Sequence, residues 1–411
     1  MEGWKDYKVS EVIEEISMGP FGSNIKVDNF INFGVPVLNG SNLQGFKLNE
    51  KTFNYVSQKK ADSLGKAIAH KGDIIITHRG TLGQIVYIPE NSKYEQYVIS
   101  QSQFRLKLKQ NLVRPDYFVY FFHTRLGQHR ILMNASQVGV PALARPTSTF
   151  KEVLIPVPPM TVQSHVMEIL HSLDDKIEIN LRINENLEQQ AQALFKSWFV
   201  DFEPFRDQPF VESELGMIPQ GWRVGKLSDI ADIYMGASPA GSSYNVLGIG
   251  DVFYQGRAEF GVRFPQRKMY TTEAKRFAEV NSVLLSVRAP VGDINVAEEK
   301  CCIGRGLASI KSKTNHNSFN IYLMKQLKPI FDTYNGEGTV FGCINKKAIE
   351  SLKIIIPDGN VVDKFDSIVS YIDEKIRVIE KQSRTLSSLR DTLLPRLMSG
   401  ELKVQEIEES L

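Results

Sequence analysis

The chain has 411 residues, which is too long for one ordinary domain and fits two or three. Apolar residues make up 42% of it, enough for proper cores, yet no apolar run approaches the ~18 residues that a membrane span needs. The opening MEGWKDYKVS carries acids and no apolar stretch, which excludes a signal peptide, so we expect a cytoplasmic protein.

Residues 1–159 have the pattern of a mixed α/β globular domain. Short β-rich runs are separated by Gly, Pro and Asn turns, as at 73–77, 84–88 and 103–108. This block is basic, with 19 Lys and Arg against 13 Asp and Glu. Such a surplus suits a polyanion but is too modest to prove nucleic-acid binding.

A long helix is predicted over residues 160–200, followed by a linker over 201–220. Both segments are acidic, with 3 basic against 6 acidic residues and then 1 against 5. Acidic helices suit protein partners better than DNA. The apolar residues of this helix recur in mixed steps of three and four, which is typical of a coiled-coil seam.

The rest of the chain repeats this plan. Gly3-Trp4-Lys5 returns as Gly221-Trp222-Arg223, at offset 218, and the segment 72–79 returns as 281–288, at offset 209. The segments 153–158 and 173–177 return as 352–357 and 372–376, at offset 199. The order of elements is kept while the offset falls, as insertions in surface loops would produce. Each half is therefore a complete unit.

The repeat predicts a second mixed α/β domain over 221–357, a second long helix over 358–402 and a tail over 403–411. The second domain holds 18 basic against 12 acidic residues, and the segment after it holds 8 against 11. The predicted fold class is α+β, with two mixed α/β domains alternating with two helices that pair as an antiparallel coiled coil. Asn184 and Ser383 interrupt the two apolar stripes at matched positions; either they fix the register of the helices or they face water.

Two long phrases carry a family resemblance. The segment 194–202, LFKSWFVDF, with 213–222, SELGMIPQGW, resembles the central region of type I restriction–modification specificity subunits. The segment 393–402, LLPRLMSGEL, is similar to the distal region of that family. Together with the duplicated plan, the resemblance covers nearly the whole chain.

This resemblance implies a noncatalytic subunit with two target-recognition domains, each reading one half of a split, asymmetric site in double-stranded DNA. It further implies that the helices hold two methyltransferase (modification) subunits, which methylate adenine, and that restriction/translocase subunits join the complex. S-adenosylmethionine, ATP and Mg would then belong to those partners, with no cofactor in this chain. The residues expected to form the partner-binding helices are Leu173, Ile177, Leu187, Leu194, Trp198, Ile372, Ile376, Leu386, Leu393 and Leu397.

Residues shared by both halves cannot explain two different half-sites. Arg79 and Arg288 are equivalent in the repeat, and each lies in a glycine-containing turn after a strand. For these two, and for His78, we predict phosphate contact or fold support, with a structural salt bridge as the alternative.

Base readout is predicted where the halves differ: 44–60 and 125–145 in the first domain, 255–276 and 335–347 in the second. Arg, Lys, Asn and Gln match base edges with paired hydrogen bonds. The candidates are Gln44, Asn134, Gln137 and Arg145, and Arg257, Arg263, Arg267 and Lys268, with plain surface exposure as the alternative for each.

Other functions are less well supported. A self-sufficient enzyme would need motifs that are missing, because the sequence holds no phosphate-binding loop and no N-P-P-Y-like methyltransferase motif. The three cysteines form no C-x-x-C pair, and no His pair has metal-ligand spacing, so neither a catalytic nor a metal site is predicted. A scaffold or repressor-like protein without an enzyme partner remains the other alternative.

Overall fold

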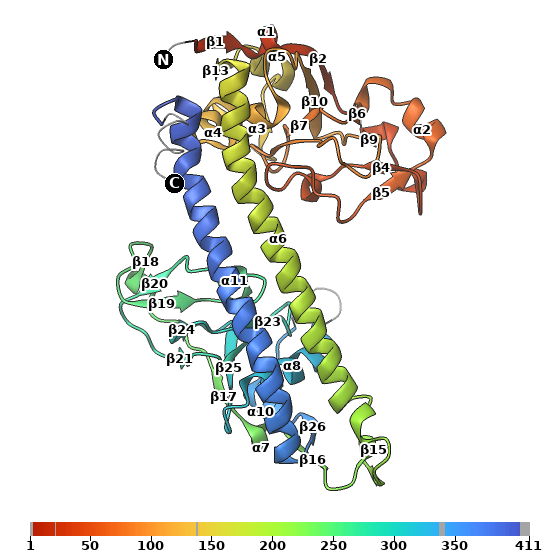
Figure 1. Cartoon of the computed structure of the whole chain (residues 1–411), viewed down its shortest axis with the longest axis vertical. Coiled ribbons are helices and arrows are strands. Elements are labelled where there is room, and N and C mark those ends of the chain that lie inside the picture. The colour runs from red at the N-terminus through yellow and green to blue at the C-terminus, as the bar shows by residue number, and fades with distance from the viewer. Residues whose placement is uncertain (1–2, 21, 137–138, 337–341, 403–411) are drawn as a thin grey trace. The chain divides into compact units, whose positions relative to one another are not determined.

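The computed structural model describes residues 3–20, 22–136, 139–336 and 342–402 (Figure 1). The chain divides into two compact units: unit 1 is Met1–Ile179 with Ser383–Leu411, and unit 2 is Asn180–Gln382. Within the described residues, no helix combines the length and the apolar character that crossing a membrane requires.

The described residues of unit 1 form a two-stranded ribbon, two larger sheets and a hairpin. A two-stranded ribbon pairs β1 (Lys5–Lys8) with β13 (Leu154–Val157), so the start and the end of the globular part are neighbours (Figure 1). An antiparallel sheet has the order β2-β10-β7-β8, made of Ile13–Met18, Gln103–Leu108, Ile74–Thr77 and Ile85–Tyr87. A five-stranded sheet has the order β3-β5-β4-β9-β6, made of Phe30–Ile31, Asn54–Val56, Val35–Val37, Gln96–Val98 and Ile68–His70.

Helices and a hairpin complete unit 1. They are α1 (Val9–Val12), α2 (Gln58–Asp62), α3 (Pro115–His123), α4 (Arg125–Leu132), β11 (Ala135–Ser136), β12 (Ala142–Leu143) and α5 (Pro146–Lys151). The predicted strands at 73–77, 84–88 and 103–108 are confirmed as β7, β8 and β10. All four residues of β7 are buried, which explains why three consecutive isoleucines precede Thr77 instead of an alternation of apolar and polar residues.

Unit 2 repeats the same arrangement. Its ribbon pairs β16 (Arg223–Lys226) with β26 (Lys353–Ile356). Its antiparallel sheet has the order β17-β25-β22-β23, made of Ala231–Met235, Leu307–Ser312, Val283–Ser286 and Ile294–Val296. Its five-stranded sheet has the order β18-β20-β19-β24-β21, made of Tyr244–Asn245, Tyr270–Thr271, Asp251–Tyr254, Cys301–Ile303 and Phe277–Ala278.

The remaining elements of unit 2 are α7 (Leu227–Ile230), α8 (Asn317–Gln326), α9 (Lys328–Asp332), α10 (Lys346–Glu350) and the hairpin β14–β15 (Phe210–Ser213 and Gly216–Pro219). This hairpin lies in the segment 201–220 that the sequence indicates as a linker. Phe205 and Ile218 of the same segment are buried in the core of unit 2, next to Trp222. The segment is therefore an ordered part of unit 2.

Two long helices are present where the sequence predicts them, α6 (Met160–Phe199) and α11 (Gly359–Ser399). Residues 160–179 of α6 and 383–399 of α11 belong to unit 1, and the rest of both helices belongs to unit 2. Each unit has its own apolar core, to which its helix segments contribute, with Val166, Leu170 and Leu397 in unit 1 and Phe195 and Phe365 in unit 2. The mixed α/β fold with two repeated domains is confirmed.

Candidate nucleic-acid interface

The turn after β7 in unit 1 is held by a hairpin from later in the chain. Arg79 forms an isolated antiparallel bridge with Ala142. The Gly80 N–H donates to the Pro141 carbonyl at 2.8 Å, and the Leu143 N–H donates to the His78 carbonyl at 2.9 Å. The hairpin β11–β12 therefore extends the sheet beyond the end of β7.

Unit 2 has the same backbone frame. Arg288 bridges Cys343, the Ala289 N–H donates to the Gly342 carbonyl at 3.0 Å, and the Ile344 N–H donates to the Val287 carbonyl at 3.1 Å. These hydrogen bonds match those of unit 1 one for one. The equivalence of Arg79 and Arg288, inferred from the repeat, thus extends to their main-chain partners.

A glycine closes the turn in both units. Gly83 and Gly292 have φ of 84° and 93°, a backbone region that disfavours residues with a side chain. A Cβ on Gly83 would lie 2.4 Å from Gln128 Oε1, and one on Gly292 would lie 2.5 Å from the Phe331 Cβ. Both glycines therefore allow a helix to pack closely behind the turn, which leaves the arginine on its outer side.

Arg79 and Arg288 are both exposed, and among the described residues neither guanidinium has an ion-pair partner. The alternative of a structural salt bridge therefore finds no support in the part of the chain that the structure describes. An exposed, unpaired arginine on a rigid turn is suited to a phosphate. Phosphate contact itself stays a prediction.

His78 has a different environment. It is half-buried, with its Nε2 3.1 Å from the Gln101 carbonyl, and burial lowers the pKa of its imidazole. At neutral pH the ring is uncharged and can donate to that carbonyl, which supports the fold. At its repeat position unit 2 has the buried Val287, so an apolar side chain serves there as well.

The base-readout candidates of unit 1 that the structure describes are exposed. Asn134 and Arg145 lie on the two arms of the hairpin that Arg79 bridges, and the Ala144 N–H donates to the Asn134 carbonyl at 3.1 Å. Arg145 has a left-handed backbone with φ of 47°, and its carbonyl accepts from the Thr149 N–H and hydroxyl, both at 3.0 Å. Gln44 lies on a separate loop beside β8, and Gln137 falls outside the described residues.

The base-readout candidates of unit 2 are mostly paired with acids. Arg257 is 2.9 Å from Asp293, and Arg267 is 2.5 Å from Glu299. Both pairs are partly exposed, so a DNA backbone or base could displace the carboxylate at low cost. Lys268 is exposed and has no ion-pair partner among the described residues.

Arg263 does not fit base readout. Only 4% of this residue is exposed, and its guanidinium contacts Glu188 and Asp373, each at 2.5 Å. Reaching a base edge would require breaking both pairs and leaving two carboxylates buried. The prediction for Arg263 is corrected accordingly: its role is structural.

The apolar residues predicted for the partner-binding helices face the chain's own cores. Leu187, Leu194, Trp198, Ile372 and Ile376 contribute to the core of unit 2, and Leu393 and Leu397 to that of unit 1. Leu173, Ile177 and Leu386 are half-buried. The faces that a partner would meet carry exposed apolar side chains as well as polar ones, among them Ile179, Ile368 and Val378.

Asn184 is buried, so the alternative that it faces water is wrong for this residue. Its Nδ2 donates to the Ile376 carbonyl of α11 at 3.3 Å, within unit 2. In the same unit the Asn180 Nδ2 donates to Gln382 Oε1 at 3.1 Å. Two polar side chains of α6 thus contact α11 at defined positions, as a register-fixing residue does.

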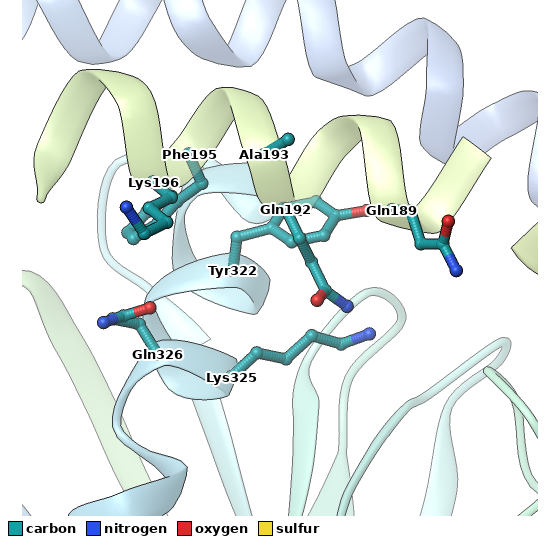
Figure 2. Close-up of a pocket in the computed structure, with 8 residues that line it drawn as sticks. All are labelled: Gln189, Gln192, Ala193, Phe195, Lys196, Tyr322, Lys325 and Gln326. Carbon is teal, nitrogen blue, oxygen red and sulfur yellow. The ribbon is translucent and has the colours of Figure 1, made fainter. Parts of the chain in front are cut away.

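A shallow pocket of about 320 Å³ lies on unit 2 between α6 and α8 (Figure 2). Its lining mixes polar and apolar side chains and includes Gln192 and Lys196 of α6 and Tyr322 and Lys325 of α8. The Lys325 ammonium pairs with Glu188, so its charge is already neutralised. Among the described residues, no group of three or more His, Cys, Asp or Glu side chains could hold a metal ion.

Sequence reasoning missed the role of the repeated motif at 173–177 and 372–376. Asp174 and Asp373, at its second position, each accept a hydrogen bond from a tyrosine of the adjacent domain, Tyr120 and Tyr322. The sequence contains a signal for this role, because an acid recurs at offset 199 within an apolar stripe. An acid at such a position indicates a hydrogen-bond partner inside the protein rather than contact with solvent.

Comparison with known proteins shows which family has this repeated architecture. The model of the type I restriction modification DNA specificity domain matches residues 1–189 and again 219–387, one match for each half of the repeat. The chain belongs to this family. The family predicted from the sequence is thereby confirmed.

Relatives in this family match nearly the whole chain. The chain is 30% identical to the MjaX and 29% identical to the MjaIX type I restriction enzyme specificity subunits of Methanocaldococcus jannaschii, covering 98% of this chain and 95% of each relative. The fold is similar to that of a crystal structure of a type I restriction–modification S subunit from M. genitalium, with a TM-score of 0.57, 16% identity and 96% of each chain covered.

Proposed function

We propose that this chain is the noncatalytic DNA-reading subunit of a type I restriction–modification complex and that each unit reads one half of a bipartite, asymmetric site. The carrying observation is the repeated turn, where an exposed arginine lies on the same backbone frame in both units. Side chains around that turn differ between the units. A shared phosphate contact with unshared base contacts would give one binding mode and two half-site sequences.

The helices are proposed to form an antiparallel coiled coil that sets the distance between the half-sites. In unit 2, Asn184 contacts Ile376 while Asn180, earlier in α6, contacts Gln382, later in α11, so the two segments run in opposite directions there. Two similar units related by such a pair present equivalent surfaces to two identical partners. These partners are proposed to be modification subunits, which bring S-adenosylmethionine and methylate adenine.

Restriction subunits, with ATP and Mg, are proposed to join the same assembly. The chain itself would then contribute recognition and scaffolding only. Purified alone and mixed with S-adenosylmethionine and DNA, it is expected to show no methyl transfer. Detectable transfer would contradict the noncatalytic assignment.

Mapping methylated adenines in a host that carries this gene with its modification partner tests the proposal directly. The expected result is a motif of two short defined sequences separated by an unspecified spacer of constant length. A single undivided motif, or a map unchanged by deletion of this gene, would refute it.

A further inference from the structure

Each recognition domain is joined to the long helices of its own unit by a buried polar cluster. We call them junction 1 (Phe46, Tyr120, Asp174 and Arg390) and junction 2 (Glu188, Arg263, Tyr322, Lys325 and Asp373). Both are built around the tyrosine–aspartate hydrogen bond that the repeat conserves between its halves. They differ in where the cationic side chains come from.

In junction 1 the helices supply both charges. Asp174 of α6 accepts from Tyr120 and pairs with Arg390 of α11, whose Nη1 is 2.6 Å from its Oδ1. The domain adds two aromatic rings, Phe46 and Tyr120, stacked with centroids 3.9 Å apart, and the Arg390 guanidinium lies 5.0 Å from the Phe46 centroid. Within junction 1 the domain side is therefore uncharged. Lys47, next to Phe46, pairs with the more exposed Asp175 at 3.1 Å, but the repeat places an acid, Glu374, at the matching position, so this pair does not distinguish the two helix sites.

In junction 2 the domain supplies the cations and the helices supply only anions. Arg263 contacts Glu188 of α6 and Asp373 of α11, each at 2.5 Å, and Lys325 also pairs with Glu188. Tyr322 donates to Asp373 at 2.9 Å. Figure 2 shows Tyr322 and Lys325 reaching from α8 toward α6.

The helix sequences differ at the positions that matter. By the offset of 199, Asp174 matches Asp373, but Glu188 matches Ser387 and Arg390 matches Ala191. The segments 187–191 and 386–390 both begin with leucine and then diverge. The helix residues of junction 2, which we call the second helix site, therefore offer two carboxylates. Those of junction 1, the first helix site, offer a carboxylate and an arginine.

From this difference we infer that the two junctions form a charge-matching code that assigns each recognition domain to its own helix site and so fixes the order of the two half-sites. Domain 1 placed on the second helix site would leave Glu188 and Asp373 buried without a cation. Domain 2 placed on the first would bring Arg263 and Lys325 against Arg390. Both mismatches bury unpaired charge, which is strongly destabilising.

The inference rests on the proposed function, and a domain-duplication experiment tests it. In the full-length chimera, residues 221–357 replace residues 3–158, so that domain 2 occupies both positions. One version keeps the natural helices, and a second carries Ser387→Glu with Arg390→Ala, which reproduces Glu188 and Ala191. Each is co-expressed with the modification partner, and methylated adenines are mapped and counted.

The chimera with Ser387→Glu and Arg390→Ala is expected to methylate a symmetric site made of two copies of the domain 2 half-site. Its methylation of that site should be at least tenfold more complete than that of the chimera with natural helices. Equal methylation by both versions would overturn the inference. If the natural chain gives a bipartite methylated motif but the two chimeras methylate equally, only the inference about the junctions is rejected. If the natural chain gives a single undivided motif, the proposed function itself is rejected.

A second variant keeps the inference testable if neither chimera folds. Ser387→Glu with Arg390→Ala in the natural chain creates the mismatch for domain 1, and Ser388→Glu with Arg396→Ala is the matched control on exposed positions of the same helix. The mismatch is expected to broaden the spacer lengths that are methylated while the half-site bases stay the same, because the domain is held less firmly. An unchanged spacer distribution, equal to that of the control, would overturn the positioning role.

Discussion

The two recognition domains share a backbone frame but use their basic side chains differently. In unit 1, Arg79, Asn134 and Arg145 surround one hairpin and have no acidic partner among the described residues. In unit 2, Arg257 and Arg267 are paired with acids and Arg263 is buried between helices. An arginine in a variable loop is therefore no guide to base readout until its neighbours are known. Of the two units, unit 1 presents the more accessible set.

The largest effect is expected from exchanging a whole domain. Replacing residues 1–158 with the equivalent of another family member should change one half-site completely and leave the other unchanged, because the proposed base contacts of that half-site all lie within the exchanged segment. Methylated-adenine mapping gives the answer. Changes in both half-sites would show that the two units do not recognise their half-sites independently.

Removing the shared arginines should weaken DNA binding without altering its specificity. Arg79→Ala and Arg288→Ala are each expected to cost about 1.5 kcal/mol, or roughly tenfold in affinity, since a charged hydrogen bond to phosphate is lost. Each should also reduce the slope of log affinity against log salt by about 1. Affinity of the assembled complex for its methylation target, titrated at several salt concentrations, measures both.

Arg206→Ala is the control for this pair, because Arg206 is also exposed, pairs with Glu203 and belongs to neither turn. A loss of specificity in the Arg79 variant, or an effect of only one of the two substitutions, would show that the two arginines do not contact DNA in the same way.

A smaller and more local effect is expected at Arg145. Arg145→Ala should cost about 1–3 kcal/mol for one base pair of the half-site read by unit 1 and relax specificity at that position alone. Arg145→Lys keeps the charge but loses the paired hydrogen-bond geometry, so it should relax the same position while retaining more affinity. Binding to a panel of single-base variants of the target separates these outcomes. A uniform loss across the panel would instead indicate a phosphate contact.

The smallest expected effect is a difference between the two units in how their stability depends on pH, because their histidine content differs. Six of the seven histidines lie in unit 1, and burial lowers the pKa of His78, His123 and His171 there. A lowered pKa in the folded state means that these rings resist protonation. Their contribution to stability is complete above the unfolded pKa of about 6.5 and is lost as pH falls below it.

Hydrogen exchange of the full chain at pH 7.5 and 5.5, corrected for intrinsic rates, should therefore show a loss of protection in unit 1 that exceeds the loss in unit 2. Equal losses in both units would contradict the assignment of this sensitivity to the buried histidines.

Much of the fold follows from local sequence patterns. The strands β7, β8 and β10 are continuous or alternating apolar runs bounded by turns, and α6 and α11 have long apolar stripes, so period and length suffice to place them. The duplication could be found because Gly83 and Gly292 and the acids at 174 and 373 serve steric and hydrogen-bonding needs that both halves share.

The site was less predictable because burial depends on the tertiary partner. Arg263 lies in a basic loop indistinguishable by composition from an exposed one, and only Glu188 and Asp373, 75 and 110 positions away, reveal its role. Likewise, the apolar stripes of α6 and α11 predict a surface for partners, whereas most of the residues named for that role, such as Leu194 and Leu397, contribute to the cores of the two units. Sequence spacing shows which residues are apolar but not which surface covers them.

The two-stranded ribbons have a consequence for heredity. Because β1 opposes β13, with Lys5 facing Val157, and β16 opposes β26, with Arg223 facing Ile356, each globular domain begins and ends at one place. Two genetic crossovers, one in the codons of each strand of a ribbon, would exchange the globular domain between them and leave the long helices α6 and α11 unchanged. Under the proposed function, a lineage could then acquire a new target sequence in one recombination event, and the proposed partner subunits would follow the change together.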